Sequence, residues 1–215
     1  AIDSIYNEIN GKNSFEFKKE KSLLNKDFTL EDKIELKNIS FSYEDNNKPA
    51  IQNLSLNIPL NSFVSIVGAS GAGKSTVLDI ILGLLAPKQG EVLIDGHPLS
   101  SIVENYQQNI SYVGQNIFLN NDSIKNNICF GVNQNDIDEK KLSNAIKASN
   151  LLDLVNELPE GIDTKIGERG VKISGGQQQR VAIARALYLD RNIIILDEAT
   201  SSLDGISENN ILKRL

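Results

Sequence analysis

The sequence contains few of the residues that build disulfides and soft-metal sites. Its 215 residues include no methionine, no tryptophan, one cysteine and one histidine. With Cys129 alone, an intrachain disulfide and a zinc cluster built from cysteines are both excluded. Because a natural chain starts with methionine unless it is processed, we expect this chain to be a piece of a longer protein.

Long hydrophobic runs and excess positive charge are absent as well. A membrane span needs about 18 consecutive apolar residues, and the best candidate, residues 77–86, is too short and contains Asp79. The formal net charge of -6 argues against a partner such as duplex nucleic acid, which requires a basic face. With 40% hydrophobic residues the chain can still bury a core, so we expect a folded protein.

The first 32 residues differ in pattern from the rest. Apolar residues recur at helical spacing at Ile2, Ile5 and Ile9, which predicts a short amphipathic helix. A polar, lysine-rich stretch over residues 11–26 follows and is typical of a linker. We therefore place a domain boundary near residue 32 and treat residues 33–215 as one domain.

Hydrophobic spacing over residues 33–215 predicts an α/β fold. Alternating patterns predict strands over 34–41, 54–58, 92–94 and 110–113, with a turn at residues 45–47 between the first two. The nearly continuous apolar runs Phe63–Val67 and Ile193–Leu196 are typical of buried parallel strands. Helices are expected after residue 74, over 123–158 with a stop at 159–161, and over 175–189.

The segment from Gly68 to Ser75 reads GASGAGKS and matches the phosphate-loop pattern G-x-x-x-x-G-K-[ST]. Its glycines allow tight turns whose N–H groups converge on phosphate oxygens, and the following helix directs its positive end to the same anion. Lys74 is expected to reach the β and γ phosphates, and Ser75 to supply a hydroxyl to Mg²⁺. The loop alone predicts ATP or GTP binding and does not separate a kinase from a GTPase or a transport ATPase.

Two carboxylates follow the last predicted strand. Asp197 and Glu198 come directly after Ile193–Leu196. Since ligands of open α/β sheets sit beyond the carboxyl ends of the strands, Asp197 is expected to hold Mg²⁺ and Glu198 to polarise an attacking water. Two adjacent acids of this kind favour hydrolysis over transfer to a specific acceptor.

The segment ISGGQQQR over residues 173–180 resembles the signature motif of ABC ATPases, usually written LSGGQ. Ser174, Gly175, Gly176 and Gln177 match that motif, and Ile173 replaces the usual leucine at a position expected to be apolar packing. Ser174 offers a hydroxyl and the glycines offer open N–H groups at a helix start, which suits a second phosphate clamp.

Further landmarks of the family occur in order. Tyr43 lies in a segment that resembles the aromatic loop and is expected to stack on adenine. Gln115 lies in a segment that resembles the Q-loop, where it would contact Mg²⁺ and the attacking water, and Asp204 in one that resembles the D-loop. The resemblance, which covers residues 34–215, implies that ATP is bound by Tyr43, Gly68, Ser70, Gly71, Gly73, Lys74, Ser75 and Thr76.

The resemblance implies an architecture, cofactors and partners. It predicts an α/β fold in which a P-loop ATPase core with a parallel sheet carries an N-terminal antiparallel β subdomain and an inserted helical subdomain. Two such cassettes would pair head to tail, each ATP with its Mg²⁺ lying between the phosphate loop of one and Ser174 of the other. Closure around ATP would drive the transmembrane domain of the same transporter at the cytoplasmic face of a membrane.

Two segments are similar to those of exporters. In TKIGERG, residues 164–170, Glu168 and Arg169 would lie near the coupling helices of a membrane domain. In NIFL, residues 116–119, which residues 124–128 follow, Phe118 would face such a helix. On this interpretation residues 1–32 link the cassette to a preceding transmembrane helix.

Other functions stay open at this stage. A soluble ABC ATPase of DNA repair, chromosome structure or translation usually carries coiled-coil insertions or a second cassette, and no heptads separate the phosphate loop from the signature here. A non-catalytic nucleotide-binding subunit usually loses the residue equivalent to Glu198 or alters the signature, and both are intact. A plain P-loop kinase would leave the signature unexplained.

The family also has a histidine beyond the D-loop that contacts the γ phosphate. The only histidine here, His97, lies in a predicted turn within the β region. We therefore expect the sequence as given to bind nucleotide and hydrolyse it slowly. A version extended beyond Leu215 through that histidine should exceed its ATPase rate by well over an order of magnitude, and equal rates in a side-by-side assay would refute this expectation.

Overall fold

The computed structural model describes residues 29–43 and 48–198, and the chain divides into two compact units, 1–109 and 110–215. Each unit is described by itself below. Four of the sequence predictions fall outside the described residues, namely the helix near residues 2–9, the linker over 11–26, the turn at 45–47 and the D-loop with Asp204.

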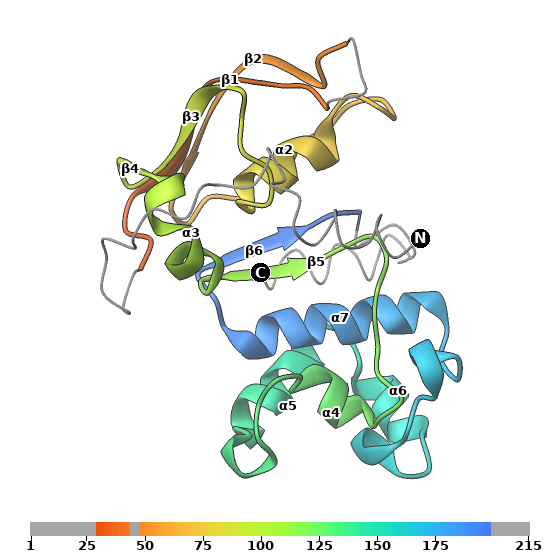
Figure 1. The fold of residues 1–215 in the computed structure, drawn as a ribbon. Helices are drawn as coiled ribbons and strands as arrows, with labels where there is room; N and C mark the ends of the chain where they lie inside the picture. Colours follow the sequence, from red (N-terminus) through yellow and green to blue (C-terminus); the bar gives the residue numbers. More distant parts are fainter. Residues whose placement is uncertain (1–28, 44–47, 199–215) are drawn as a thin grey trace, which may run out of the picture. The chain divides into compact units, whose positions relative to one another are not determined.

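The first unit contains a four-stranded sheet in the order β2-β1-β3-β4 (Figure 1). Its strands are antiparallel and comprise β1 Lys33–Phe41, β2 Ile51–Pro59, β3 Gln89–Ile94 and β4 His97–Pro98. In β1 the apolar residues Ile34, Leu36, Ile39 and Phe41 are all buried, as their alternation predicts. The step from Leu36 to Ile39 is odd because the register shifts there in a bulge, which returns the apolar residues to the buried face.

Tight turns fix the edges of this sheet. Asp95 and Gly96 join β3 to β4 with φ values of 51° and 81°, the left-handed pair that a two-residue hairpin favours. The Asp95 carboxylate also accepts hydrogen bonds from the backbone N–H groups of residues 31, 32 and 33, at 2.7, 2.8 and 2.8 Å, and so fastens the start of β1 to the hairpin. His97, predicted to lie in a turn, instead follows the turn and pairs with Ile94.

Two helices lie among the described residues of this unit. Helix α2 spans Lys74–Ile81 and helix α3 spans Leu99–Gln107, with buried apolar residues on one side of each. The end of α2 is tied to α3, because the Gln107 Nε2 donates to the Leu82 carbonyl at 3.0 Å. At its other end α2 begins at Lys74, directly after the phosphate loop, as the sequence predicts.

One strand prediction in this unit is wrong. No strand forms over Phe63–Val67, and the side chains of Phe63 and Val67 are 70% and 85% exposed. A parallel strand of this kind draws its hydrogen bonds and its burial from neighbouring strands, and no strand of the described residues pairs with this segment. A run of apolar residues indicates that a segment favours burial, but it does not indicate which neighbouring strands would bury it.

The second unit is built around one long helix, α7, which spans Gly175–Leu189. Strands β5, Ile110–Val113, and β6, Ile193–Leu196, pair in parallel, with Ile110 opposite Ile193 and Val113 opposite Leu196. Helix α7 covers one face of this pair, where its residues Ala182, Ile183 and Ala186 are buried with Val113 (Figure 1). The fold class predicted from the sequence, with an antiparallel β part, a parallel pair and a helical part, is thus confirmed.

Short helices pack on the other side of α7. They are α4 Ile124–Ile128, α5 Glu139–Ala148 and α6 Leu152–Glu157, with 3-10 turns at 134–136, 161–163 and 168–170. Ser123 caps α4 by accepting from the Asn126 N–H, and Asp138 caps α5 by accepting from two N–H groups. The predicted helical region over 123–158 is therefore confirmed, although as three separate helices. In the described parts of the chain no helix is long and apolar enough to cross a membrane.

The core of this helical part is apolar and holds the only cysteine. Ile124, Ile128 and Leu142 pack with Val181 and Cys129, each at most 2% exposed. Burial raises the pKa of the Cys129 thiol, which stays protonated as a small apolar side chain.

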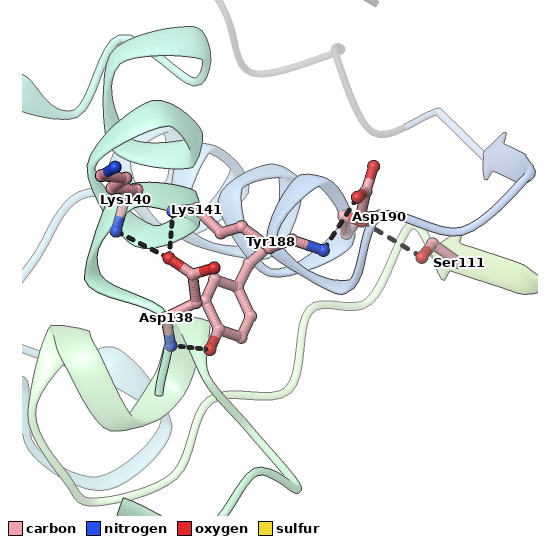
Figure 2. Close-up of polar contacts among 7 residues, drawn as sticks. Ser111, Asp138, Lys140, Lys141, Tyr188 and Asp190 are labelled. Carbon is pink, nitrogen blue, oxygen red and sulfur yellow. Dashed lines mark hydrogen bonds and ion pairs between the residues drawn. The ribbon is translucent and has the colours of Figure 1, made fainter. Parts of the chain in front are cut away.

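Polar contacts tie α7 to its neighbours at its carboxyl end (Figure 2). The Tyr188 hydroxyl accepts a hydrogen bond from the backbone N–H of Asp138 at 3.1 Å, and the Lys141 ammonium lies 2.9 Å from the Asp190 carboxylate. On the opposite side the buried Ser111 hydroxyl donates to the Ala186 carbonyl at 3.1 Å. The two backbone N–H bonds at the α5 cap, chiefly that from Lys141, lower the pKa of Asp138. Helix α7 is thereby bonded both to α5 and to β5.

Alanine substitutions at two glycines distinguish the cost of a left-handed backbone from the cost of a steric clash. Gly90 and Gly96 both have φ of +81°, but a Cβ at Gly90 would overlap the carbonyls of Lys37 and Asn38 on β1, whereas one at Gly96 would meet nothing within 4 Å. We expect Gly96→Ala to cost about 1–2 kcal/mol of unfolding free energy, because it suffers only from the left-handed φ. Gly90→Ala should cost more than about 3 kcal/mol, because β1 and β3 must also move apart.

Urea unfolding of the two variants, followed by circular dichroism, measures both values. Equal losses for Gly90→Ala and Gly96→Ala would contradict the close approach of β3 to β1.

Candidate functional site

The phosphate loop of the first unit closes on its own lysine. Gly73 precedes α2 with φ of 87°, and no side chain caps the helix start at Lys74. The Lys74 ammonium donates to the carbonyls of Gly68 and Ala69, both at 3.0 Å. The first N–H groups of α2 have no side-chain partner, and together with the nearby cation they form a place suited to an anion.

Two glycines of this loop are required for different reasons. A Cβ at Gly73 would lie 2.6 Å from the Ala50 carbonyl, so the loop approaches the start of β2 too closely for any side chain. Gly71 has φ of 77° and open space around it, so its left-handed backbone, and not crowding, demands glycine. Ser70 and Ser75 are exposed in the same segment, with their hydroxyls available to a ligand.

The structure brings Tyr43 to the same helix start. Its hydroxyl lies 3.2 Å from the Thr76 hydroxyl on the first turn of α2. The Tyr43 ring meets Phe41 edge to face, with ring centroids 5.0 Å apart, and is 39% exposed. Tyr43 is thus fixed beside the phosphate loop while its ring stays accessible for stacking on a planar base, whereas Thr76 is buried.

In the second unit the carboxyl ends of β5 and β6 bring three predicted site residues together. The Asp197 N–H donates to the Val113 carbonyl at 2.9 Å and so extends the parallel pair by one residue. Just beyond it, the Gln115 Nε2 donates to the Glu198 Oε2 at 2.9 Å. Gln115, Asp197 and Glu198 therefore meet at the strand ends, as the sequence predicts.

Sequence reasoning missed one neighbour of this acidic pair. Tyr112 on β5 donates its hydroxyl to the Asp197 carboxylate at 3.4 Å. A Cβ at Gly114 would lie 3.0 Å from the Tyr112 ring, so glycine at 114 leaves the space that the ring occupies. The alternation of side chains along β5 puts Tyr112 on the face opposite Val113, and this pattern is the sequence feature from which its position could have been predicted.

Glu198 has φ of 51°, a conformation that costs a non-glycine residue about 1–3 kcal/mol and is typical of functional sites.

The signature residues form the start of α7. The Ser174 hydroxyl accepts from the Gln177 N–H at 3.3 Å while the Gln177 Oε1 accepts from the Ser174 N–H at 2.8 Å, a reciprocal capping box. Ser174 retains its own O–H for donation, and a Cβ at Gly175 would meet nothing within 4 Å. Gln177 thus serves the helix start through its side chain. Ile173 is 8% exposed within the core, which confirms its predicted packing role.

The donors predicted for Mg²⁺ fit that ion chemically. The Ser75 hydroxyl, the Gln115 amide oxygen and the Asp197 carboxylate are all hard oxygen ligands, and Mg²⁺ favours one or two carboxylates completed by water and phosphate. The Gln115 contact to Glu198 uses the amide nitrogen and leaves the amide oxygen to a metal. Within residues 29–43 and 48–198, no group of three or more His, Cys, Asp or Glu side chains is arranged as a metal site.

The exporter-like segments lie on the surface of the second unit. Phe118 is 65% exposed, and Glu168 and Arg169 form an exposed 3-10 turn in which Arg169 has φ of 52°. Phe118 borders a hollow of about 270 Å³ lined by β5, residues 116–118 and α7. This hollow combines aromatic, aliphatic and cationic groups on one surface.

Substitutions of Ser174 test its role as the N-cap of α7. We expect Ser174→Ala to lower the unfolding free energy by about 0.5–2 kcal/mol, because the Gln177 N–H loses its acceptor. Ser174→Asn should be nearly neutral, since asparagine is an equally good N-cap. Urea titration of both variants checks this, and a Ser174→Asn as unstable as Ser174→Ala would argue against the capping box.

Known proteins resemble this chain in sequence and in fold. The family described as "ABC transporter" matches residues 51–201. Curated relatives include ATP-dependent lipid A-core flippases of Cupriavidus pinatubonensis, 39% identical over 80% of this chain and 30% of the relative, and of Escherichia coli K12, 41% identical over 83% and 31%.

A solved structure of a bacterial Atm1-family ABC exporter with ATP bound superposes with a TM-score of 0.80 at 35% identity, covering 87% of this chain and 33% of that one. The chain spans about a third of the length of these proteins. A family match over most of the chain, the matching fold and the grouped motif residues lead to one conclusion, that this chain belongs to the ABC transporter family.

Proposed function

We propose that this chain is the ATP-binding and ATP-hydrolysing cassette, over residues 33–215, of a transporter that exports or flips its cargo across a membrane. The observation that carries the proposal is the contact of Gln115 with Glu198 beside Asp197 at the strand ends. An accessory nucleotide-binding subunit has no use for a polarising carboxylate at that position. The flippase and exporter names of the relatives support transport over DNA repair or translation.

The nucleotide is held by two groups of residues in the proposed site. Tyr43 stacks on the base, and the N–H groups of the loop, including those of Gly71 and Gly73, bind phosphate oxygens. Lys74 moves its ammonium from the carbonyls of Gly68 and Ala69 to the β and γ phosphates. This exchange is favourable because the phosphate oxygens carry charge and the carbonyls do not.

The residues that would promote ATP hydrolysis are the acidic residues of the second unit and Gln115. Glu198 orients and polarises the attacking water, and Gln115 holds that carboxylate in place through its amide nitrogen. Asp197, Gln115 and Ser75 would hold Mg²⁺, which would supply positive charge to neutralise the phosphates.

Two partners complete the proposal. Ser174, Gly175 and Gly176 of one copy cap the γ phosphate bound by a second copy. Phe118, with Glu168 and Arg169, faces a coupling helix of the transmembrane domain. In this proposal the cassette works at the cytoplasmic face of the membrane.

Substitution of Glu198 tests the proposal. Glu198→Gln keeps the shape of the side chain and an oxygen that accepts from Gln115, but removes the charge that polarises water. We expect kcat for ATP hydrolysis in the intact protein to fall about 10²–10⁴-fold while ATP is still bound. Lys74→Ala should instead weaken nucleotide binding, because it removes the cation from the phosphate loop.

Phosphate release and titration with a fluorescent nucleotide measure the two effects. Glu157→Gln, on the exposed surface of α6, serves as the matched control and should retain the wild-type rate. Undiminished hydrolysis by Glu198→Gln would exclude the assigned role of this carboxylate, and a wild type that binds no ATP would exclude the whole proposal.

A further inference from the structure

Arg185, in the second half of α7, bonds to the segment that follows Gln115. Its Nε donates to the Asn127 carbonyl at 2.7 Å and a terminal nitrogen donates to the Phe118 carbonyl at 3.1 Å. Its guanidinium also lies 5.4 Å from the centre of the Phe130 ring. One side chain of α7 thus holds residues 118 and 127 at once.

Asn127 makes the segment between these two contacts rigid. It is fully buried, and its amide donates to the carbonyls of Asn120 and Ser123 at 3.1 and 2.9 Å. Its Oδ1 accepts from the Asn120 N–H at 2.8 Å. Residues 118–127, which run from the loop after Gln115 into α4, therefore form one braced segment, and Arg185 is the charged group that bonds this segment to α7.

The environment of Arg185 makes its bonds costly to lose. Burial lowers the pKa of the Arg185 guanidinium, and the two carbonyls that accept from it replace part of its lost hydration. If the side chain withdrew, the Phe118 and Asn127 carbonyls would both lose a charged donor. Arg185 also lines the same hollow that Phe118 borders.

We propose that Arg185 is a positioning residue that makes the loop after Gln115 and the signature helix move as one body. The inference rests on the proposed function and extends it, because it links the residue beside Glu198 to the residue that caps a second copy's nucleotide. Ser174 begins α7, and Arg185 lies about three turns further along the same rigid helix. A displacement of Phe118 therefore moves Ser174. In the opposite direction, contact of Ser174 with the nucleotide of a second copy moves the loop after Gln115.

Hydrogen exchange of the intact protein, with and without a non-hydrolysable ATP analogue, tests this link. In the wild type we expect the analogue to slow exchange in both segments, 116–120 and 174–177. In Arg185→Gln the change at 174–177 should persist while the change at 116–120 is lost. The kcat for ATP should fall about tenfold, with KM within about twofold of wild type, because the phosphate loop and Tyr43 are unaffected.

Arg180→Gln is the matched control, since Arg180 lies on the same helix but donates to the Asn150 carbonyl, outside the loop. It should retain the analogue-linked change at 116–120. Arg185→Lys, whose single ammonium can reach one carbonyl at a time, should give an intermediate change and serves as the deciding variant if Arg185→Gln does not fold.

An analogue-linked change at 116–120 that equals the wild type in the Arg185 variants would overturn the inference. A wild type that binds the analogue without hydrolysing ATP would count against the proposed function alone, because the exchange experiment depends only on binding.

Discussion

The parallel pairing of β5 with β6 determines where the acidic residues lie. Because Val113 stands opposite Leu196 and bonds to the N–H of Asp197, both strands end at the same edge. Gln115 and Glu198, 83 positions apart in the sequence, meet there within hydrogen-bond distance. A register shift of one residue would turn the side chains of one strand to the other face, so register and site geometry depend on each other.

Helix α7 connects the pair of strands β5 and β6 to the helical part of the second unit. Its apolar face packs on Val113 and its buried Val181 joins the helical core, while Ser111 and Tyr188 bond it to β5 and to the start of α5. A helix held on both sides moves as a unit, because packed interiors resist gradual deformation. The residue that caps α7 and the residue that holds the loop after Gln115 are therefore parts of one rigid element.

The sequence predicted this architecture well wherever local rules were decisive. Helix α7 begins and ends at the predicted residues because Ser174 and Gln177 form a local cap and Asp190 closes the end in a left-handed conformation. The strands β1 and β6 were found from alternation and from an unbroken apolar run. The run Phe63–Val67 failed, because a parallel strand needs partners that the sequence does not name. Tyr112 and Arg185 were missed because their roles depend on which distant segment lies opposite.

The burial of Cys129 has a practical consequence. Its thiol is 2% exposed, its pKa is raised by burial, and the chain has no other cysteine. Alkylating labels react with thiolates at accessible positions, so the native side chain is shielded from them. A cysteine introduced at an exposed position becomes the sole reactive thiol without prior removal of Cys129. A pair of such positions, one in each unit, would accept spin or fluorescent labels, and the distance between the units could then be followed through the ATP cycle.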